Sequence, residues 1–411
     1  MRIVADLHVH SKYARATSNR CDVDGLSEGA KIKGIDVMAT GDFTHPAYFN
    51  ELKMKLTEEK NGLYPYRGVN FILSTELAIT YGEPGSKKRM HHIVLAPSLE
   101  IVEQINDRMT KYGRLTEDGR PMLSISSAEL VEQLEEVSKD IVVIPAHAWT
   151  PWFGVFGSKT GVNSLKETFQ DKADRIFAIE TGLSSDPEMN WMISSLDNIS
   201  LVSNSDAHSP EKLGREANVF ELEKPGYENI INAIKTRKGF VKTYEFYPEE
   251  GKYHYDGHRE CKVRWTPWES IKHKNICPVC RKKVTVGVLH RVVELADRKP
   301  GDKPENAIPF QHIVPLKILL SKILKKTETT VVVNEEYNKL IKYFGNEFSV
   351  FEADDERILQ ATSPEIAKGI LKVKNNDVKW LAGYDGVFGE LVLDNNSKKG
   401  EERKQSKLLE F

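Results

Sequence analysis

Asp6-Leu7-His8-Val9-His10 follows the apolar residues Ile3 and Val4 and has the alternation of a β-strand. Side chains alternate across a strand, so His8 and His10 share one face while Leu7 and Val9 share the other. Two imidazoles on one face can bind a single cation, and the apolar side chains can pack behind them. This stretch therefore predicts a metal site on the first strand.

Composition limits the class of protein. A chain of 411 residues is longer than one hydrophobic core usually organises, so we expect two or more domains. With 58 Lys and Arg against 60 Asp and Glu, the net charge of −2 excludes a uniformly basic nucleic-acid-binding surface and permits only local patches. The first strand has no leader-like segment before it, and no apolar stretch reaches about 18 residues, so we expect a cytoplasmic protein.

The first 245 residues alternate between strand-like and helix-like segments, which predicts an α/β fold with a parallel sheet, closed or open. The expected strands are 35–39, 71–74, 93–96, 141–145, 176–179 and 201–203. Ligand-type residues occur at the ends of these segments, where α/β folds place their active sites. They are His8, His10, Asp42, Glu76, His91, His92, His147, Asp206 and His208.

Each of these residues alone would most often be a structural residue. Together they favour a cation, because converging imidazoles and carboxylates would otherwise repel one another or stay without partners. Mixed nitrogen and oxygen ligands suit Zn²⁺, Mn²⁺ or Fe²⁺. Such cations lower the pKa of a bound water and orient a phosphate, so phosphoester hydrolysis by a metal-activated water is the expected chemistry.

This ordered ligand set resembles the polymerase and histidinol phosphatase (PHP) superfamily, whose fold is a distorted (β/α)₇ barrel. The resemblance covers about the first 240 residues and implies one metal site of His8, His10, Glu76 and Asp206. It implies a second site in which Glu76 bridges to His147 and to His92, which we prefer over His91 because it directly abuts the strand. These residues, above all Asp206, Glu76, His8 and His10, are the expected catalytic residues.

The third PHP site departs from the family pattern. Family members usually show Thr-Asp-His and a further early His, whereas this chain has Gly41-Asp42-Phe43 and Arg15. Asp42 or His45 could join His208 there, and we prefer Asp42. The resemblance implies divalent metals in the barrel, Zn, Mn or Mg, without fixing their number.

A second metal site is predicted between 246 and 290. His258 and Cys261, separated by two residues, are followed after fifteen residues by Cys277-Pro278-Val279-Cys280. Two chelating pairs with this separation are typical of one structural zinc, and three clustered cysteines suit a metal better than disulfides in a reducing compartment. His254 is the alternative first ligand, but only His258 reproduces the two-residue gap.

The same segment is locally basic. Residues 258–290 contain eight Lys or Arg against two Glu, interspersed with Trp265 and Trp268. Positive charge for phosphates and flat rings for bases suit DNA, although such a run can also be a solvated face. We expect Arg259, Arg264 and Lys282 to contact DNA. Residues 291–394 are predicted to be a small helical DNA-binding domain, with helices over 313–326 and 334–344 and a third that starts near Thr362.

Three further stretches resemble the archaeal endonuclease Q family: 251–259, Cys277–Cys280 followed by Val288-Leu289-His290-Arg291-Val292, and Gly383-Tyr384-Asp385-Gly386-Val387-Phe388-Gly389. The resemblance spans essentially the whole chain. It implies a DNA-repair endonuclease that cuts 5′ of hypoxanthine, uracil or xanthine, and at abasic sites, in double-stranded DNA. Two rivals stay open: a small-molecule phosphatase of the histidinol-phosphate type, and a non-catalytic zinc-ribbon DNA-binding protein.

Two segments are candidates for contacts with DNA and with a partner. The loop after His147 carries Trp149, Trp152 and Phe153, which either line a base pocket or close the barrel rim. After a polar linker from about 395, Gln405, Leu408 and Phe411 have the spacing of a sliding-clamp (PCNA) peptide. We therefore expect a flexible tail, 395–411, that binds the clamp.

Overall fold

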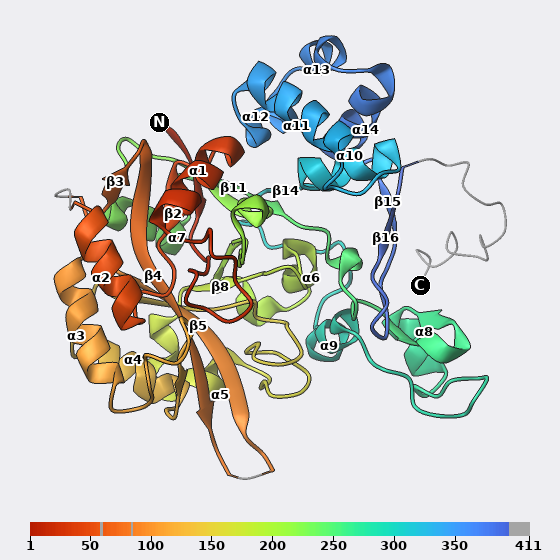
Figure 1. Ribbon diagram of the computed structural model, residues 1–411. Helices are drawn as coiled ribbons and strands as arrows, with labels where there is room; N and C mark the ends of the chain where they lie inside the picture. The colour runs from red at the N-terminus through yellow and green to blue at the C-terminus, as the bar shows by residue number, and fades with distance from the viewer. Residues whose placement is uncertain (58–60, 84, 394–411) are drawn as a thin grey trace.

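The computed structural model describes residues 1–57, 61–83 and 85–393, and it has the expected α/β architecture (Figure 1). Ten strands form one curled half-barrel sheet in the order β14-β11-β10-β1-β2-β4-β5-β7, with β3 and β6 alongside β4. A separate parallel pair consists of β8 (Ala178–Glu180) and β9 (Ser200–Val202). The sheet strands are β1 (Arg2–Asp6), β2 (Val37–Ala39), β3 (Tyr64–Tyr66), β4 (Val69–Tyr81), β5 (Lys88–Ala96), β6 (Met122–Leu123), β7 (Val142–Pro145), β10 (Ala217–Glu221), β11 (Phe240–Glu245) and β14 (Phe310–His312).

Strand direction explains why the barrel is distorted. β1 runs parallel to β2 but antiparallel to β10, and the long β4 and β5 pair as an antiparallel hairpin. A regular sequence of β/α units would make every pair parallel. The expected strands are present, but several of their pairings are antiparallel.

Within the described part of the barrel, seven α-helices accompany the strands: α1 (Val23–Lys33), α2 (Pro46–Lys55), α3 (Leu99–Met109), α4 (Ser127–Glu135), α5 (Leu165–Phe169), α6 (Pro187–Trp191) and α7 (Tyr227–Thr236). Local sequence sets their ends. Asp22 caps α1 by accepting from the backbone N–H of Gly25, and Gly34 ends it in the left-handed region. Ser98 caps α3 in the same way.

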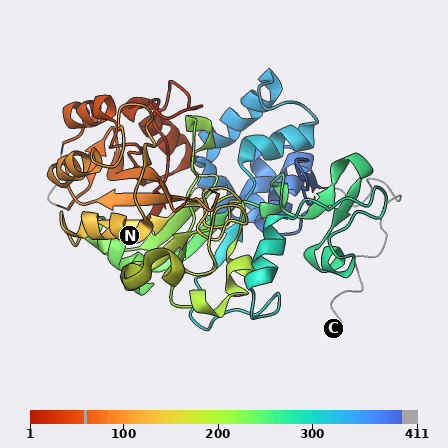
Figure 2. The same ribbon diagram turned by 90° about the horizontal axis from the view of Figure 1, so that it is seen from below.

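The predicted zinc module, residues 246–290, is small and has little apolar core. It contains β12 (Asp256–His258), β13 (Val263–Trp265) and α8 (Pro267–Lys272), and its buried cluster is limited to Val263, Cys277 and Val284. Figure 2 shows it at the opposite end of the molecule from the barrel. A module of this size needs a further stabilising element, such as a bound metal, in addition to its hydrophobic core.

The chain returns to the barrel after this module, which differs from the expected domain boundary at 290/291. α9 (Val288–Leu295) buries Val288 and Val292 in the barrel core. β14 then pairs in parallel with β11, so that Thr243 faces Phe310. The apolar face of α9 explains the difference, because it cannot be buried within the small zinc module.

The helical domain follows from residue 314. It consists of α10 (Leu316–Leu324), α11 (Val331–Phe344), α12 (Glu347–Glu352), α13 (Asp355–Ala361) and α14 (Pro364–Lys374) around its own core, and the expected helices correspond to α10, α11 and α14. Lys33 of α1 reaches Glu347 at 2.5 Å in a buried ion pair that ties this domain to the barrel. The short hairpin of β15 (Lys379–Leu381) and β16 (Glu390–Val392) then extends to the zinc module (Figure 1).

None of the helices in the described ranges combines the length and the apolar character needed to cross a bilayer.

Candidate metal centre

Three overlapping groups of ligand-type side chains lie at the barrel mouth. They are His8, His10 and Glu76; His10, Asp206 and His208; and Glu76, His91 and His147. Glu76 is shared by two groups, since its Oε2 lies 3.2 Å from His10 Nε2 and its Oε1 lies 2.9 Å from His147 Nε2. His10 Nε2 also lies 3.1 Å from Asp206 Oδ1. Residues from five strands and the loops after them, β1, β4, β5, β7 and β9, therefore meet at one point.

The donor set fits divalent cations. Among the described residues, His8 Nε2, His10 Nε2 and Asp206 Oδ1 are buried without a hydrogen-bond partner although they face one another. Buried polar atoms are almost always paired, so converging unpaired ligand atoms indicate a cation that these residues would hold. Mixed imidazole and carboxylate ligation suits Zn²⁺, Mn²⁺ or Fe²⁺.

Electrostatics differs among the ligands: it favours an ionised Glu76 and a neutral His91, whereas facing carboxylates outweigh burial and raise the pKa of His8, His10 and His147 above the usual value. Burial opposes ionisation of Glu76, yet the facing imidazoles, first His91 and then His8, lower its pKa well below the usual value. Burial lowers the pKa of His91 to about 4, which keeps the imidazole neutral. An ionised carboxylate and a neutral imidazole are the forms that coordinate metals.

The preference for His92 over His91 is wrong. In the β4–β5 ladder, Glu76 faces Ile93, Ala78 faces His91 and Leu77 faces His92. His91 therefore lies on the face of Glu76, with Nδ1 at 2.7 Å from Glu76 Oε1. His92 points to the other face, where its Nε2 lies 3.0 Å from Ser127 Oγ.

The assignment of Asp42 as a ligand is also corrected. Asp42 Oδ1 lies 3.0 Å from His10 Nδ1, and Oδ2 accepts hydrogen bonds from the N–H and hydroxyl of Ser11. Asp42 thus orients His10 from behind instead of joining a ligand group. His45 stacks on Tyr13 with ring centroids 4.4 Å apart and belongs to none of the three groups, whereas His208 does belong to one.

Glu180 is a supporting residue that the sequence analysis missed. It is fully buried, and its Oε1 lies 3.0 Å from His8 Nδ1. Its Oε2 accepts from the backbone N–H of His147 at 2.7 Å, and Asn204 donates to Oε1. One carboxylate therefore positions ligands of two groups, as supporting carboxylates do around metal-binding histidines. Its place at the end of a strand was the available signal.

Arg120 is a second residue beside the ligands that was not predicted from the sequence. Its Nη1 donates to Glu76 Oε2 at 3.2 Å, and its side chain is about a quarter exposed at 26%. Gly119 makes the approach possible, because a Cβ there would lie 2.5 Å from Asp42 Oδ2. A guanidinium thus lies among the ligands while part of it remains open to solvent. No motif around residue 120 indicated this position.

The backbone is strained at three of the residues in and around the cluster. Asp42, His147 and Asp206 have φ values of 42°, 29° and 46°, in the region that favours glycine. Such strain persists where surrounding structure enforces it and is concentrated at functional sites. Here it aims side chains at the cluster from the ends of strands.

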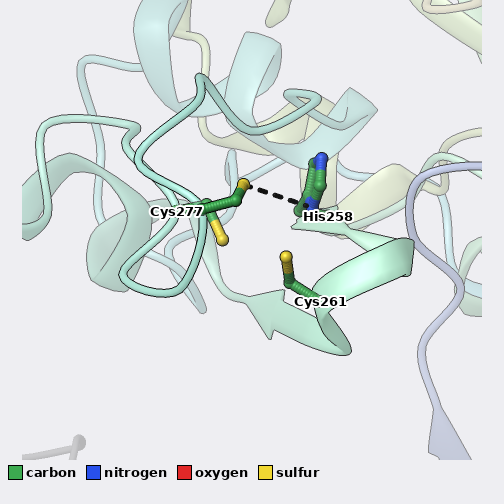
Figure 3. Close-up of side chains that lie close together, drawn as sticks. His258, Cys261 and Cys277 are labelled. Atoms are coloured by element: carbon green, nitrogen blue, oxygen red, sulfur yellow. Dashed lines mark hydrogen bonds between the residues drawn. The ribbon is translucent and has the colours of Figure 1, made fainter.

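The structure also brings together the four predicted ligands of the zinc module. The ligand atoms of His258, Cys261, Cys277 and Cys280 all lie within 4.8 Å of one another. Figure 3 shows His258, Cys261 and Cys277 directed toward a common space. The alternative ligand His254 is buried elsewhere and stacks on Tyr255. A set of one imidazole nitrogen and three cysteine sulfurs fits Zn²⁺.

The aromatic residues of the loop after His147 have different roles. Trp149 is 1% exposed and donates to Asn190 Oδ1, so it is a core residue and its assignment as a DNA contact is corrected. Phe153 stacks on His91 with centroids 4.4 Å apart and covers this ligand. Trp152 is 52% exposed beside it. Arg259, Arg264 and Lys282 are all exposed on the zinc module.

The clamp-peptide residues Gln405, Leu408 and Phe411 lie outside the described residues.

The curled sheet with clustered ligands at its mouth defines a protein of the PHP class. Family models agree: residues 196–238 match the PHP-associated family, and residues 315–377 match the MJ0043 C-terminal domain family. Over 252 residues, 60% of this chain, the sequence is 32% identical to the Methanocaldococcus jannaschii protein MJ0043, but it spans only 31% of that protein. It is 28% identical to the Bacillus subtilis protein YqxK, covering 95% of this chain and 99% of the relative.

Comparison with solved structures shows which family the chain belongs to. The lesion-specific endonuclease PfuEndoQ from Pyrococcus furiosus superposes with a TM-score of 0.87 at 31% identity, covering 97% of this chain and 98% of that one. A complex of endonuclease Q with a 27-mer duplex that carries an abasic lesion at the active site gives a TM-score of 0.84 at 30% identity, covering 98% and 100% of the two chains. The chain therefore belongs to the endonuclease Q family.

Proposed function

We propose that this chain is a DNA-repair endonuclease that hydrolyses the phosphodiester 5′ to hypoxanthine, uracil, xanthine or an abasic site. The observation that carries the proposal is the joining of three ligand groups through Glu76 and His10 in a chain that matches endonuclease Q over nearly its whole length. Divalent cations held there would lower the pKa of water, orient the phosphate and offset charge on the leaving oxygen.

The protein's own residues prepare this chemistry. His8, His10, Glu76 and Asp206 would hold one cation, and Glu76, His91 and His147 would hold a second. Glu180 and Asp42 fix His8 and His10 through their Nδ1 atoms, leaving Nε2 free to coordinate. Trp152, exposed in the loop that follows the ligand His147, is proposed to contact unstacked DNA.

The zinc module (246–290) and the helical domain, which starts at residue 314 in the structure, are proposed to bind the duplex. Support comes from eight cations in 258–290 and from the exposure of Arg259, Arg264 and Lys282. Backbone phosphates are the natural partners of such a surface. A small-molecule phosphatase has no need for either part, and a non-catalytic DNA-binding protein has no need for joined ligand groups.

One assay tests the function and separates these rivals. Purified full-length protein with Mn²⁺ or Mg²⁺ is incubated with duplexes that contain one uracil, one hypoxanthine or only normal bases, alongside an Asp206→Asn variant and a histidinol phosphate control. We expect cuts on the 5′ side of the deaminated bases only, and none with the variant. Phosphate release without DNA cutting would favour the phosphatase, and DNA binding without any hydrolysis the binding protein.

Arg120 is placed to bind a non-bridging oxygen of the scissile phosphate. A guanidinium matches phosphate with paired N–H donors, which an ammonium cannot reproduce. We expect Arg120→Met to lower the single-turnover cleavage rate about a hundredfold, and Arg120→Lys to restore only part of it. Rapid-quench cleavage and metal content by mass spectrometry check this. A wild-type rate, or a loss explained by missing metal, would contradict the role.

The tail is proposed to bind the sliding clamp through Gln405, Leu408 and Phe411, on the spacing of the peptide alone. Removing residues 404–411 is expected to abolish clamp binding in a pull-down with purified clamp and to leave clamp-independent cutting unchanged. Retained clamp binding would move the contact elsewhere in the chain.

A further inference from the structure

The loop Gly383–Gly389 presents an exposed apolar tip on a rigid base. Val387 is 41% exposed and Phe388 is 64% exposed. Isolated exposed apolar residues are common on proteins, so exposure alone decides nothing. Here the exposed tip belongs to a loop whose backbone is fixed by hydrogen bonds at nearly every position.

The tip is a tight two-residue turn. The N–H of Tyr384 donates to Val387 O at 3.0 Å, and the N–H of Val387 donates back to Tyr384 O at 2.8 Å. Between them, Asp385 and Gly386 have φ values of 43° and 85°, as a type I′ turn requires. Phe388 therefore leaves this turn in a defined direction.

The turn is anchored to the start of the zinc module. Asp385 accepts from the backbone N–H of Arg259 at 2.8 Å and from the Thr285 hydroxyl at 2.6 Å. The N–H of Gly389 donates to the carbonyl of Glu250 at 2.9 Å, and a Cβ at Gly389 would lie 2.0 Å from the carbonyl oxygen of Glu249. A phenylalanine is thus held out to solvent on a loop that has little freedom to fold it away.

A lysine lies beside the tip, and a series of hydrogen bonds connects the tip through α9 to the loop that follows the ligand His147. Lys252 Nζ lies 4.4 Å from the Phe388 ring centroid, and its carbonyl accepts from the N–H of Gly386. The next carbonyl along the chain accepts from Val288, where α9 begins. Arg291 of α9 in turn donates to Phe156 O in the loop that follows the ligand His147. Figure 1 shows the tip of this hairpin beside α8 and α9.

We propose that Val387 and Phe388 form a wedge that enters the duplex next to the lesion and holds open the stack from which the target nucleotide is extruded. The proposal rests on the proposed nuclease function. Cations at the base of the tip match phosphates, and an apolar ring matches the faces of unstacked bases. Enzymes that extrude a base must meet a cost of unstacking, which is smaller where the base is already unpaired.

Paired and unpaired lesions separate a wedge from general DNA binding. Full-length wild type and Phe388→Ser are compared on uracil opposite adenine and on uracil within a five-nucleotide bubble in the same duplex. We expect the variant to lose about tenfold in cleavage rate on the paired substrate and less than about threefold on the bubble. Phe388→Leu should restore most of the loss, and Met54→Ser, at an 80% exposed methionine of the barrel helix α2, should behave as wild type.

Every other outcome overturns the wedge. Equal losses on both substrates would assign Phe388 to general DNA contact, and unchanged rates would leave it without a role. A lower unfolding temperature for Phe388→Ser would assign it to packing instead. If wild type cuts neither uracil substrate, the nuclease function itself fails and the wedge with it, a result distinct from all the others.

Discussion

Replacing Glu76 with glutamine is expected to reduce cleavage of a uracil-containing duplex by at least about a thousandfold, because cations at such sites supply several kcal/mol of transition-state stabilisation. Glutamine keeps the size of the side chain but removes the charge that joins two ligand groups. Oε1 faces His91 and His147, and Oε2 faces His10. With the carboxylate gone, the buried imidazoles also lose the anion that offsets them.

Single-turnover cleavage and metal content by mass spectrometry measure this effect together. Glu83→Gln is the matched control, since Glu83 is exposed on the same hairpin and makes no side-chain contact with the cluster. We expect the control to retain wild-type rates and metal. Wild-type turnover by Glu76→Gln in excess Mn²⁺ would refute the proposed role of the bridging carboxylate.

The Cys277→Ser variant is expected to lose one equivalent of zinc and the fold of the zinc module, while the barrel stays intact. Cys277 is fully buried in a small cluster whose other buried members are Val263 and Val284, with Trp265 partly buried against them. Structural zinc contributes on the order of 10 kcal/mol to the folding of small modules, far more than such a core can replace. DNA affinity should fall by at least about tenfold, because the Lys and Arg side chains of the module would no longer be held on one surface.

Two readouts distinguish a local effect from global unfolding. Hydrolysis of bis(p-nitrophenyl) phosphate should remain within about twofold of wild type, and trypsin should gain cleavage sites in 258–290. Val279→Ser is the control, because Val279 lies in the same knuckle and is 68% exposed. If Cys277→Ser kept its zinc and its DNA affinity, the four-ligand assignment would be wrong.

Sequence reasoning succeeded where a short-range rule governs geometry. His8 and His10 share a face because strands alternate, and His258, Cys261, Cys277 and Cys280 converge because chelating pairs have a characteristic spacing. Strand alternation and the spacing within each chelating pair both relate residues that are only two or three positions apart. Three of the helices of the C-terminal domain, α10, α11 and α14, were predicted for the same reason, since capping and apolar periodicity are local.

The errors arose where geometry depends on partners distant in the chain. Choosing between His91 and His92 requires the register of β5 against β4, in which Glu76 faces Ile93. Glu180 and Arg120 reach the ligands only through the tertiary fold, and Asp42 was displaced from the ligand set because Ser11 and His10 occupy its oxygens. A three-residue strand such as β14 carries no detectable period.

The position of β14 has a practical consequence for dissecting the enzyme. A fragment that stops at residue 245 ends with β11 as an uncovered edge, since the strand that pairs with it comes 65 residues later, after the zinc module. Unpaired edges recruit other chains, so an isolated catalytic fragment would tend to precipitate. During synthesis the nascent sheet likewise stays unfinished until residue 312 has left the ribosome, which makes the metal-binding module an internal insertion of the catalytic body.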